Sequence, residues 1–277
     1  MKSATVRAIA FLLVAASLGT GHAAAAQGTV PATAMPNALK FCFEETPALP
    51  WRSRQKRGLY FDLFNAVARQ LDLRFEYYPQ PWRYCLAEVA AGRMDGAFAV
   101  ALSPERRLVF AYPPGAPNNE GDVLRVDVTV LIRRKGTAVT VVDGRIVGTD
   151  KPVGVLPAYA VADDLARMGW SLDTASRDHL AQLARLSRGE LDAIVLSAFR
   201  WDQLRAAGGV ALDNLEALPE PLLTKRHFLG LSHPFVAAHP ELAERLWATT
   251  REIRNSAWYR EREAAAVARE LRPRDAQ

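Results

Sequence analysis

The sequence predicts an α/β protein of two Rossmann-like lobes, joined by a hinge and separated by a central cleft. Three observations lead to this fold class. Strand and helix patterns alternate from residue 39 onward, a helix–glycine–strand unit occurs twice, and a long alternating segment lies between the two copies. Such an order is typical of parallel sheets covered by helices.

The first segment of the chain has the features of a secretory leader. Lys2 and Arg7 are basic, residues 8–18 are apolar, and an Ala-x-Ala cleavage pattern ends near Ala26. These features predict a cleavable signal peptide over residues 1–26 and export to the periplasm. No cysteine follows the apolar run, so we expect no lipid anchor. No later segment approaches the roughly 18 apolar residues of a membrane-spanning helix.

The first half of the mature chain follows a β-α-β-α-β order. Apolar residues predict strands over 39–44, 74–79 and 94–102, with helices over 59–73 and 82–91 between them. In the first helix, Leu63, Phe64, Val67 and Leu71 share one face, as expected for a helix that packs on a sheet. This order predicts a parallel sheet with helical cover as the first lobe.

A second unit of the same type follows. A strand is predicted over 151–157, a helix over 158–169, and then a further helix and strand up to residue 196. In both halves a helix ends at a glycine, and an aspartate precedes the next strand, as Gly92 and Asp95 and then as Gly189 and Asp192. The glycines fit left-handed helix ends. The aspartates are expected to close the turn into the strand.

The segment 122–136 alternates apolar and polar residues, which predicts a strand exposed on one face that crosses between the lobes. A proline at the start of the final helices, Pro240, indicates a helical tail that returns to complete the first lobe. We therefore predict lobe 1 from 37–125 with 229–277 and lobe 2 from 126–228, with hinge strands near 123–132 and 222–230. Three tryptophans are expected to pack in the interior: Trp201, Trp247 and Trp258.

Polar and aromatic side chains follow the predicted strands at their carboxyl ends, where open α/β sheets bind ligands. The candidate ligand-binding residues in lobe 1 are Glu44, Trp51, Trp82, Arg83, Ser103 and Arg106. In lobe 2 they are Tyr159 and Ser197. Aromatic walls with a few charged groups are typical of small-molecule pockets. An arginine suits a carboxylate, which it can bind through two hydrogen bonds.

Other classes of function lack their signals. The five histidines form no metal-binding pair, and the sequence contains no GxGxxG, Walker or GxSxG motif. We therefore expect no metal, no cofactor and no catalytic activity. The net charge of +5 is spread along the chain without aromatic residues between the basic ones, so nucleic-acid binding is not expected. The predicted protein is a monomer that binds a small molecule.

The chain contains two cysteines, Cys42 and Cys85. In an exported protein an even number of cysteines favours a disulfide. The bond would join the first strand of the mature chain to the first turn of the helix at 82–91. The alternative is two unrelated buried thiols.

Several motifs together resemble the bacterial extracellular solute-binding proteins of the polar amino-acid family, family 3. Gly58-x-x-x-Asp62-Leu63 resembles the family's entry to its first helix, and KPVGVLPAY resembles the entry to lobe 2. Ser103-Pro104-Glu105-Arg106 resembles its Thr-Pro-Glu-Arg signature. The series Trp82, Leu86, Gly92 and Asp95 also fits, and the resemblance extends from about Leu39 to Tyr259.

This resemblance implies the type II periplasmic-binding fold and roles for particular residues. Arg106 would pair with a ligand carboxylate, with Ser103 beside it. Trp82 would form an aromatic wall, and Glu44 would touch the ligand. The sequence departs from the family at Pro157-Ala158-Tyr159, which replaces a Gly-Ser/Thr loop, and at Ser197, where the family has an acid for the α-ammonium group.

The resemblance predicts a periplasmic protein that captures a small carboxylate-bearing solute, an amino acid or a related compound, for the permease of an ABC-type importer. An orphan sensor that presents its ligand to a membrane receptor is an alternative. A dehydratase on the same fold is another, with Glu44 as its acid or base. Structural roles also remain open: Arg106 in a surface ion pair, Trp82 and Trp51 in packing, and Ser197 as a helix cap.

Overall fold

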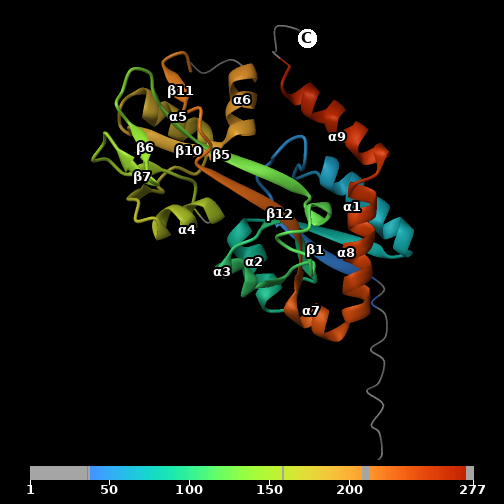
Figure 1. The fold of residues 1–277 in the computed structure, drawn as a ribbon. Helices are drawn as coiled ribbons and strands as arrows, with labels where there is room; N and C mark the ends of the chain where they lie inside the picture. The colour runs from blue at the N-terminus through green and yellow to red at the C-terminus, as the bar shows by residue number, and fades with distance from the viewer. Residues whose placement is uncertain (1–35, 37, 158, 208–211, 273–277) are drawn as a thin grey trace, which may run out of the picture. The chain divides into compact units, whose positions relative to one another are not determined.

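In this computed structural model, the described residues are 36, 38–157, 159–207 and 212–272, and residues 35–277 make up one compact unit. Two groups of elements are joined by a pair of long antiparallel strands, β5 and β12 (Figure 1). The strands of the larger sheet are β1 (Ala38–Glu44), β2 (Arg74–Gln80), β3 (Gly96–Ala101), β4 (Phe110–Ala111), β5 (Arg125–Arg134), β8 (Val153–Gly154), β9 (Leu172–Asp173), β10 (Ala193–Ser197), β11 (Leu215–Ala217) and β12 (Leu223–Ser232).

Helices alternate with these strands, and the helices α7, α8 and α9 follow the last strand, β12. The helices are α1 (Leu59–Leu71), α2 (Trp82–Ala90), α3 (Pro104–Arg107), α4 (Ala160–Arg167), α5 (His179–Ser187), α6 (Ala198–Ala207), α7 (His233–Ala238), α8 (Pro240–Arg254) and α9 (Ala257–Glu270). A 3₁₀ turn, η1 (Glu120–Asp122), and a hairpin of β6 (Thr140–Val142) with β7 (Arg145–Val147) complete the described elements. None of these helices is long and apolar enough to span a bilayer.

The main strands follow the order β2-β1-β3-β12-β5-β10-β8-β9. The pairs β1–β2 and β1–β3 are parallel in lobe 1, and β10–β8 and β8–β9 are parallel in lobe 2. Between them, β12 and β5 pair antiparallel with each other and with the strand on either side. This is the predicted fold class, with two α/β lobes connected by crossing strands.

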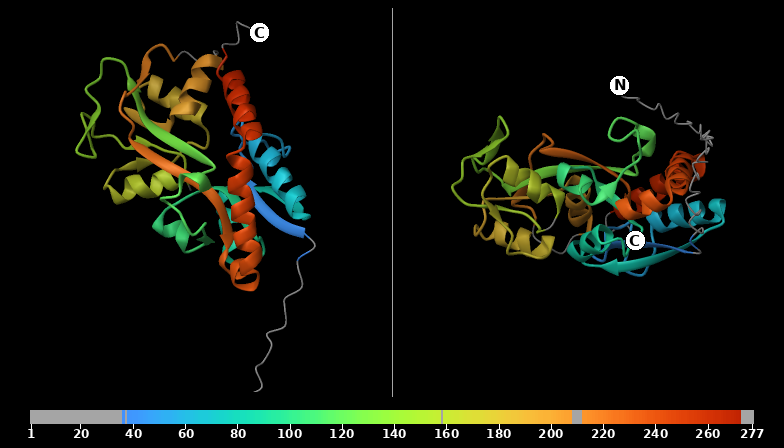
Figure 2. Two further views of the ribbon diagram at one scale, coloured as in Figure 1. Left: turned by 45° about the vertical axis from the view of Figure 1, so that its right-hand side comes forward. Right: turned by 90° about the horizontal axis from the view of Figure 1, so that it is seen from below.

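Lobe 1 has helices on both faces of its sheet. On one face, buried residues of β1 and α1 pack with residues of α7, α8 and α9, including Phe41, Phe64, Leu246 and Tyr259. On the other face, Cys85 and Val89 of α2 pack with Phe110 and Phe228. The helices α8 and α9 therefore pack against α1, and they run beside it in Figure 2.

Lobe 2 repeats this arrangement with fewer residues. Leu183 and Leu186 of α5 and Trp201 and Leu204 of α6 cover one face of β5 and β10. Leu165 of α4 and Trp170 cover the other face, against Val153 and Val195. Gly92 and Gly189 both have left-handed backbones, with φ of 68° and 80°, at the ends of α2 and α5. The two predicted helix–glycine–strand units are therefore present.

Four expectations were wrong in detail. The crossing strand β5 is buried on both faces at Val130, Leu131 and Ile132, because β10, β11 and β12 flank it and helices cover both sides. The strand predicted over 151–157 is limited to Val153–Gly154. Trp258 is 44% exposed on α9, where Arg262 lies over its ring.

The fourth concerns the two aspartates before the strands, which bind neighbouring segments instead of closing their own turns. The Asp95 carboxylate accepts the backbone N–H of Lys40 at 2.6 Å. Asp192 accepts from Arg134, Thr149 and Lys151. These bonds lower the pKa of Asp192 to about 2, chiefly through Arg134. In each lobe the aspartate therefore fixes the start of a parallel strand against the chain beside it.

Candidate ligand-binding site

A cavity of about 260 Å³ lies at the carboxyl ends of the strands, lined by residues of both lobes and of the crossing strands. Six of the eight predicted ligand-binding residues line it: Glu44, Trp51, Trp82, Arg106, Tyr159 and Ser197. The volume is close to the lower end of the range of about 300–1,000 Å³ that is typical of small-molecule sites. The fold therefore brings most of the candidate residues to one place.

The two remaining candidates lie outside the cavity lining. Ser103 is buried and caps α3, where its hydroxyl accepts the backbone N–H of Arg106 at 3.2 Å. Arg83 is exposed, and its guanidinium lies 4.7 Å from the ring centroid of Tyr84. Ser103 is thus placed to act through Arg106, whereas Arg83 contacts the neighbouring tyrosine.

Arg106 is held by the short helix α3 that follows β3. Pro104 fits the first position of this helix, because that position needs no N–H donor, and Ser103 supplies the cap. The Arg106 side chain is 10% exposed, and its Nη2 lies 3.7 Å from a carboxylate oxygen of Asp163 in α4. Arg107 does not line the cavity. Its side chain is exposed, and its guanidinium carbon lies 5.9 Å from the ring centroid of Tyr112.

The strand that leads to Arg106 contains an irregularity beside the cavity. Ala97 pairs with Gly230 and Val100 with Phe228, so two residues of β3 oppose one residue of β12. This is the pattern of a β-bulge, which bends a strand and re-aims the residues after it. Ala99 has a left-handed φ of 60° at the bulge and lines the cavity. Nothing in the alternation of the sequence signals this bulge.

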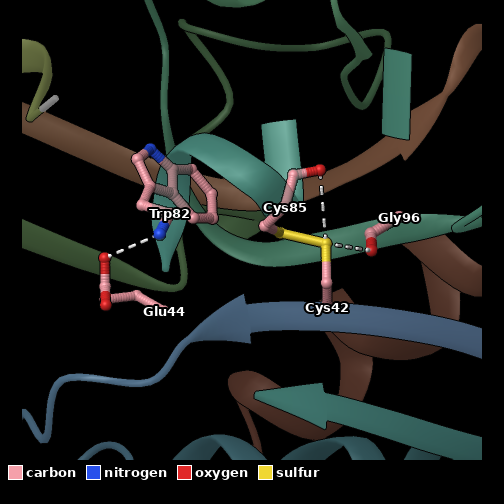
Figure 3. Close-up of a disulfide and its surroundings, with 5 residues drawn as sticks. All are labelled: Cys42, Glu44, Trp82, Cys85 and Gly96. Carbon is pink, nitrogen blue, oxygen red and sulfur yellow. Dashed lines mark hydrogen bonds between the residues drawn. A yellow bond between two sulfur atoms is a disulfide. The ribbon is translucent and has the colours of Figure 1, made fainter. Parts of the chain in front are cut away.

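The disulfide and two candidate residues form one corner of the site (Figure 3). Cys42 of β1 is bonded to Cys85 of α2, which confirms the predicted pair. One carboxylate oxygen of Glu44 accepts the backbone N–H of Trp82 at 3.1 Å, and the other accepts that of Thr46 at 3.0 Å. A carboxylate at the start of a helix is stabilised by the helix dipole. The indole of Trp82 stacks on Phe110, with centroids 6.4 Å apart.

Trp51 belongs to a second aromatic corner. It is 5% exposed and lies edge-on to Phe199 of α6, with ring centroids 4.6 Å apart. The guanidinium carbon of Arg125 lies 3.7 Å from the Trp51 ring centroid, which is a close cation–π contact. Gly58 permits this loop to approach α1, because a side chain there would lie 2.7 Å from the carbonyl oxygens of Pro50 and Trp51.

Ser197 ends β10 in lobe 2 and has two hydrogen-bond donors near its hydroxyl. The backbone N–H of Arg200 lies 3.4 Å from its oxygen, as in a helix cap, and Nη2 of Arg125 lies at 3.5 Å. A cation therefore lies beside the position where the resemblance predicted an acid. Tyr159 precedes α4, and burial raises the pKa of its phenol.

Sequence reasoning missed the polar residues of the two crossing strands. Arg125 and Asp127 on β5, and Lys225 and His227 on β12, line the cavity. They occur at every second position of their strands, so each pair lies on one face. For the strand of Arg125 this period-2 pattern predicts a face exposed to solvent, whereas the strand of Lys225 is predicted only as a hinge strand. Arg52, His179 and Arg200 also line the cavity and were not predicted.

Burial changes the protonation of the two histidines in the cavity. The pKa of His227 is lowered to about 4, first by burial, with Asp127 opposing this shift and Arg125 adding to it. Burial also lowers the pKa of His179 to about 4, and the hydrogen bond between its Nδ1 and the Gln182 Oε1, which accepts, opposes this shift. Both imidazoles are therefore neutral at pH 7. Among the described residues no group of three or more acidic, histidine or cysteine side chains could hold a metal ion.

A family model for bacterial extracellular solute-binding proteins, family 3, matches residues 45–264. The chain belongs to this family. Its members bind solutes outside the cytoplasm, and the family explains the two-lobed fold and the cavity between the strand ends. No curated protein matches the chain in sequence.

Solved structures share the fold of this family 3 member at low sequence identity. An ABC uptake transporter substrate-binding protein from Streptococcus pneumoniae with bound histidine has a TM-score of 0.64 at 17% identity, over 85% of this chain and 94% of that one. A histidine kinase sensor domain also has a TM-score of 0.64, at 15% identity, over 83% and 95%. An ancestral amino acid-binding protein, a precursor of cyclohexadienyl dehydratase, has a TM-score of 0.61 at 14% identity, over 83% and 95%.

Proposed function

We propose that this family 3 protein captures a small carboxylate-bearing solute in the periplasm and delivers it to the permease of an ABC-type importer. The observation that carries the proposal is the position of Arg106. Its guanidinium is nearly buried, lines the cavity and is held by a capped helix. A guanidinium held in place suits a carboxylate, because it can donate two parallel hydrogen bonds.

The proposed binding event couples the ligand to the two lobes. Residues 37–125 with 229–277 would form the lobe that holds Arg106 and Trp82, and residues 126–228 would supply contacts from Tyr159 and Ser197. The crossing strands β5 and β12 would act as the hinge. A ligand that contacts both lobes favours the closed arrangement by the difference in its affinity for the two arrangements. The permease would then distinguish the loaded protein from the empty one.

Export of the protein is part of this proposal. The signal peptide expected over residues 1–26 lies outside the described residues, and it would direct the chain to the periplasm. A disulfide between Cys42 and Cys85 is consistent with an oxidising compartment. The mature protein would bind its solute as a monomer, without metal, cofactor or nucleic acid.

A thermal-shift screen of amino acids and simple carboxylates tests the function. A ligand at 100 times its Kd should stabilise the folded protein by about 2.7 kcal/mol. Replacement of Arg106 by alanine should weaken binding of the best ligand by about 2–5 kcal/mol, as expected when one partner of a buried charge pair is removed. Arg107→Ala is the matched control, because that neighbouring side chain is exposed. Equal affinities of the two variants in calorimetry would contradict the role of Arg106.

Two other functions remain candidates with separate tests. A sensor role is favoured by the fold shared with a histidine kinase sensor domain, and cross-linking of the loaded protein in membranes would identify a receptor instead of a permease. A dehydratase would need Glu44 as an acid or base. Both oxygens of Glu44 already accept backbone hydrogen bonds, from Thr46 and Trp82. Turnover of a bound carboxylate, lost in Glu44→Gln, would support the enzyme.

A further inference from the structure

The lining of the cavity contains a second arginine whose side chain is held by neighbouring residues. The guanidinium of Arg125 lies on the face of Trp51, and its Nη2 donates to Asp127 at 2.7 Å and lies 3.5 Å from the Ser197 hydroxyl. Its Nε and Nη1 make no hydrogen bond within the described part of the chain, while the side chain lines the cavity. Part of its planar fork of donors is therefore still available to a ligand.

Arg125 of β5 and Arg106 of α3 line the same cavity. His227 of β12 pairs with Ala101 of β3 on one side and with Arg125 of β5 on the other. Two strand spacings separate Ala101 from Arg125, which places their Cα atoms about 10 Å apart. Since α3 follows β3 directly and carries Arg106, the two arginines line one small cavity from different elements of the fold.

The charges that line the cavity are unbalanced. Its basic side chains are Arg52, Arg106, Arg125, Arg177, Arg200 and Lys225, and its acidic ones are Glu44, Asp127 and Asp178. Each of these carboxylates already accepts a hydrogen bond from the protein: Glu44 from Trp82 and Thr46, Asp127 from Arg125, and Asp178 from Ala181. Two of the cations, Arg106 and Lys225, pair with Asp163 and Asp164 of α4, which lie outside the lining. The remaining surplus of cations favours an anionic ligand and disfavours an ammonium group.

Three buried polar atoms on residues of the cavity lining also lack a partner. The Tyr60 hydroxyl, the Trp51 indole nitrogen and the His227 Nδ1 have no hydrogen bond to any other described residue. Tyr60 is fully buried and Trp51 is 5% exposed. Buried polar groups are nearly always satisfied, so such atoms call for a ligand or water in the cavity. They add donors beside Arg125 that suit acceptor oxygens.

We propose that Arg125 is a second anion anchor and that the cavity takes a small molecule with two acidic groups and no ammonium group. This inference rests on the proposed function, because Arg106 would hold the first acidic group. Ser197 fits the proposal, since its hydroxyl accepts from Arg125, whereas an acid there would attract an amine. The second acidic group is a carboxylate or a phosphonate or phosphate, all of which match the fork of an arginine.

Probes with one carbon skeleton test the inference on the purified mature protein. Valerate carries one carboxylate, glutarate carries two, and glutamate adds an ammonium group. Shorter and longer diacids, from malonate to adipate, and 3-phosphonopropionate cover the spacing and the nature of the second acid. We expect at least one diacid to bind about tenfold or more tightly than its matched monoacid and amino diacid, a difference of about 1.4 kcal/mol. Equal or tighter binding of the monoacids or amino acids would overturn the second anchor.

Variants of Arg125 then separate the two anchors. Arg125→Gln should lower the affinity for the best diacid by about 30-fold or more, as expected when a buried charge contact is lost. The affinity for the matched monoacid should stay almost unchanged. Arg205→Gln is the control, because Arg205 lies 5.8 Å from the Trp201 ring outside the cavity lining. The double variant Arg125→Gln/Asp127→Asn avoids an unpaired Asp127 carboxylate. A diacid affinity that survives in both Arg125 variants, with melting temperatures showing that they fold, would refute the proposal.

The outcomes distinguish this inference from the proposed function. Monoacid binding that depends on Arg106 but not on Arg125, without any preference for diacids, would leave the proposed function standing and refute the second anchor. Absence of binding by every carboxylate in the series would contradict the proposed function, and the second anchor with it.

Discussion

The Nη2 of Arg106 lies 3.7 Å from a carboxylate oxygen of Asp163. Asp163 belongs to α4 of lobe 2, and its side chain is 43% exposed. Beside this pair, Glu105 of α3 forms an ion pair with Arg167, which belongs to α4 as Asp163 does. The Ser-Pro-Glu-Arg segment and α4 are therefore linked by two pairs of opposite charge, at the point where a carboxylate is proposed to bind.

Asp163 should compete with the ligand for Arg106. Replacement of Asp163 by asparagine is expected to raise carboxylate affinity a few-fold, within about 1 kcal/mol, because the pair is partly exposed and weak. Calorimetry with the best carboxylate measures this change. Asp202→Asn on α6 is the control, since Asp202 is exposed and not in the cavity lining. Weaker binding by Asp163→Asn would mean that Asp163 orients Arg106 instead of competing.

Ser103 should act on the ligand through Arg106. Ser103→Ala removes the cap of α3 and should lower the free energy of unfolding by about 1 kcal/mol. It should also weaken carboxylate binding, because α3 fixes Arg106. Ser232→Ala removes a buried cap of the same type from α7, which lies outside the cavity lining. Urea unfolding should show similar losses for both variants, and calorimetry should show weaker binding only for Ser103→Ala.

The disulfide should support both stability and binding. The bond closes a loop with a sequence separation of 43 residues. Removal of both cysteines, as Cys42→Ala/Cys85→Ala, should cost up to about 4 kcal/mol in the free energy of unfolding by the chain-entropy estimate. It should also weaken ligand binding, because the bond holds β1 and α2, which carry Glu44 and Trp82. Urea unfolding and calorimetry check the two effects, and unchanged affinity in the folded variant would limit the bond to stability.

The strand-end residues of the cavity were predictable because they follow from local patterns. Strands end where apolar runs end, and polar or aromatic residues directly after them lie at one edge of a parallel sheet. Glu44, Trp82, Arg106 and Ser197 were found in this way and all line the cavity. The helix ends at Gly92 and Gly189 were equally local, because glycine is favoured where φ is positive.

The residues that were missed depend on contacts distant in sequence. The alternation over 122–136 predicts a solvent-exposed face for the strand of Arg125, and the sequence predicts no polar face for the strand of His227. In the folded protein β5 pairs with β12, and the polar residues of both strands line the cavity. The bulge at Ala99 arises from the register between β3 and β12. The exposure of Trp258 was missed for the same reason, since helix periodicity does not say which neighbours cover a face. Periodicity identifies a face, but only tertiary structure decides what the face contacts.

His227 should make the protein less stable as the pH falls. The pKa of His227 is about 4 in the folded protein, whereas its ordinary value is 6.5. As the pH falls, the unfolded chain therefore binds a proton at this residue before the folded protein does. The stability that depends on neutral His227 is therefore fully present above pH 6.5 and is lost as the pH falls toward 4. Arg125, Arg52 and Lys225 disfavour its protonated form, and Asp127 opposes them. In urea unfolding between pH 7.5 and about 4, His227→Gln should lose less stability than the wild type. His233→Gln, an exposed residue outside the cavity lining, should follow the wild type, and identical pH profiles for all three proteins would contradict the role of His227.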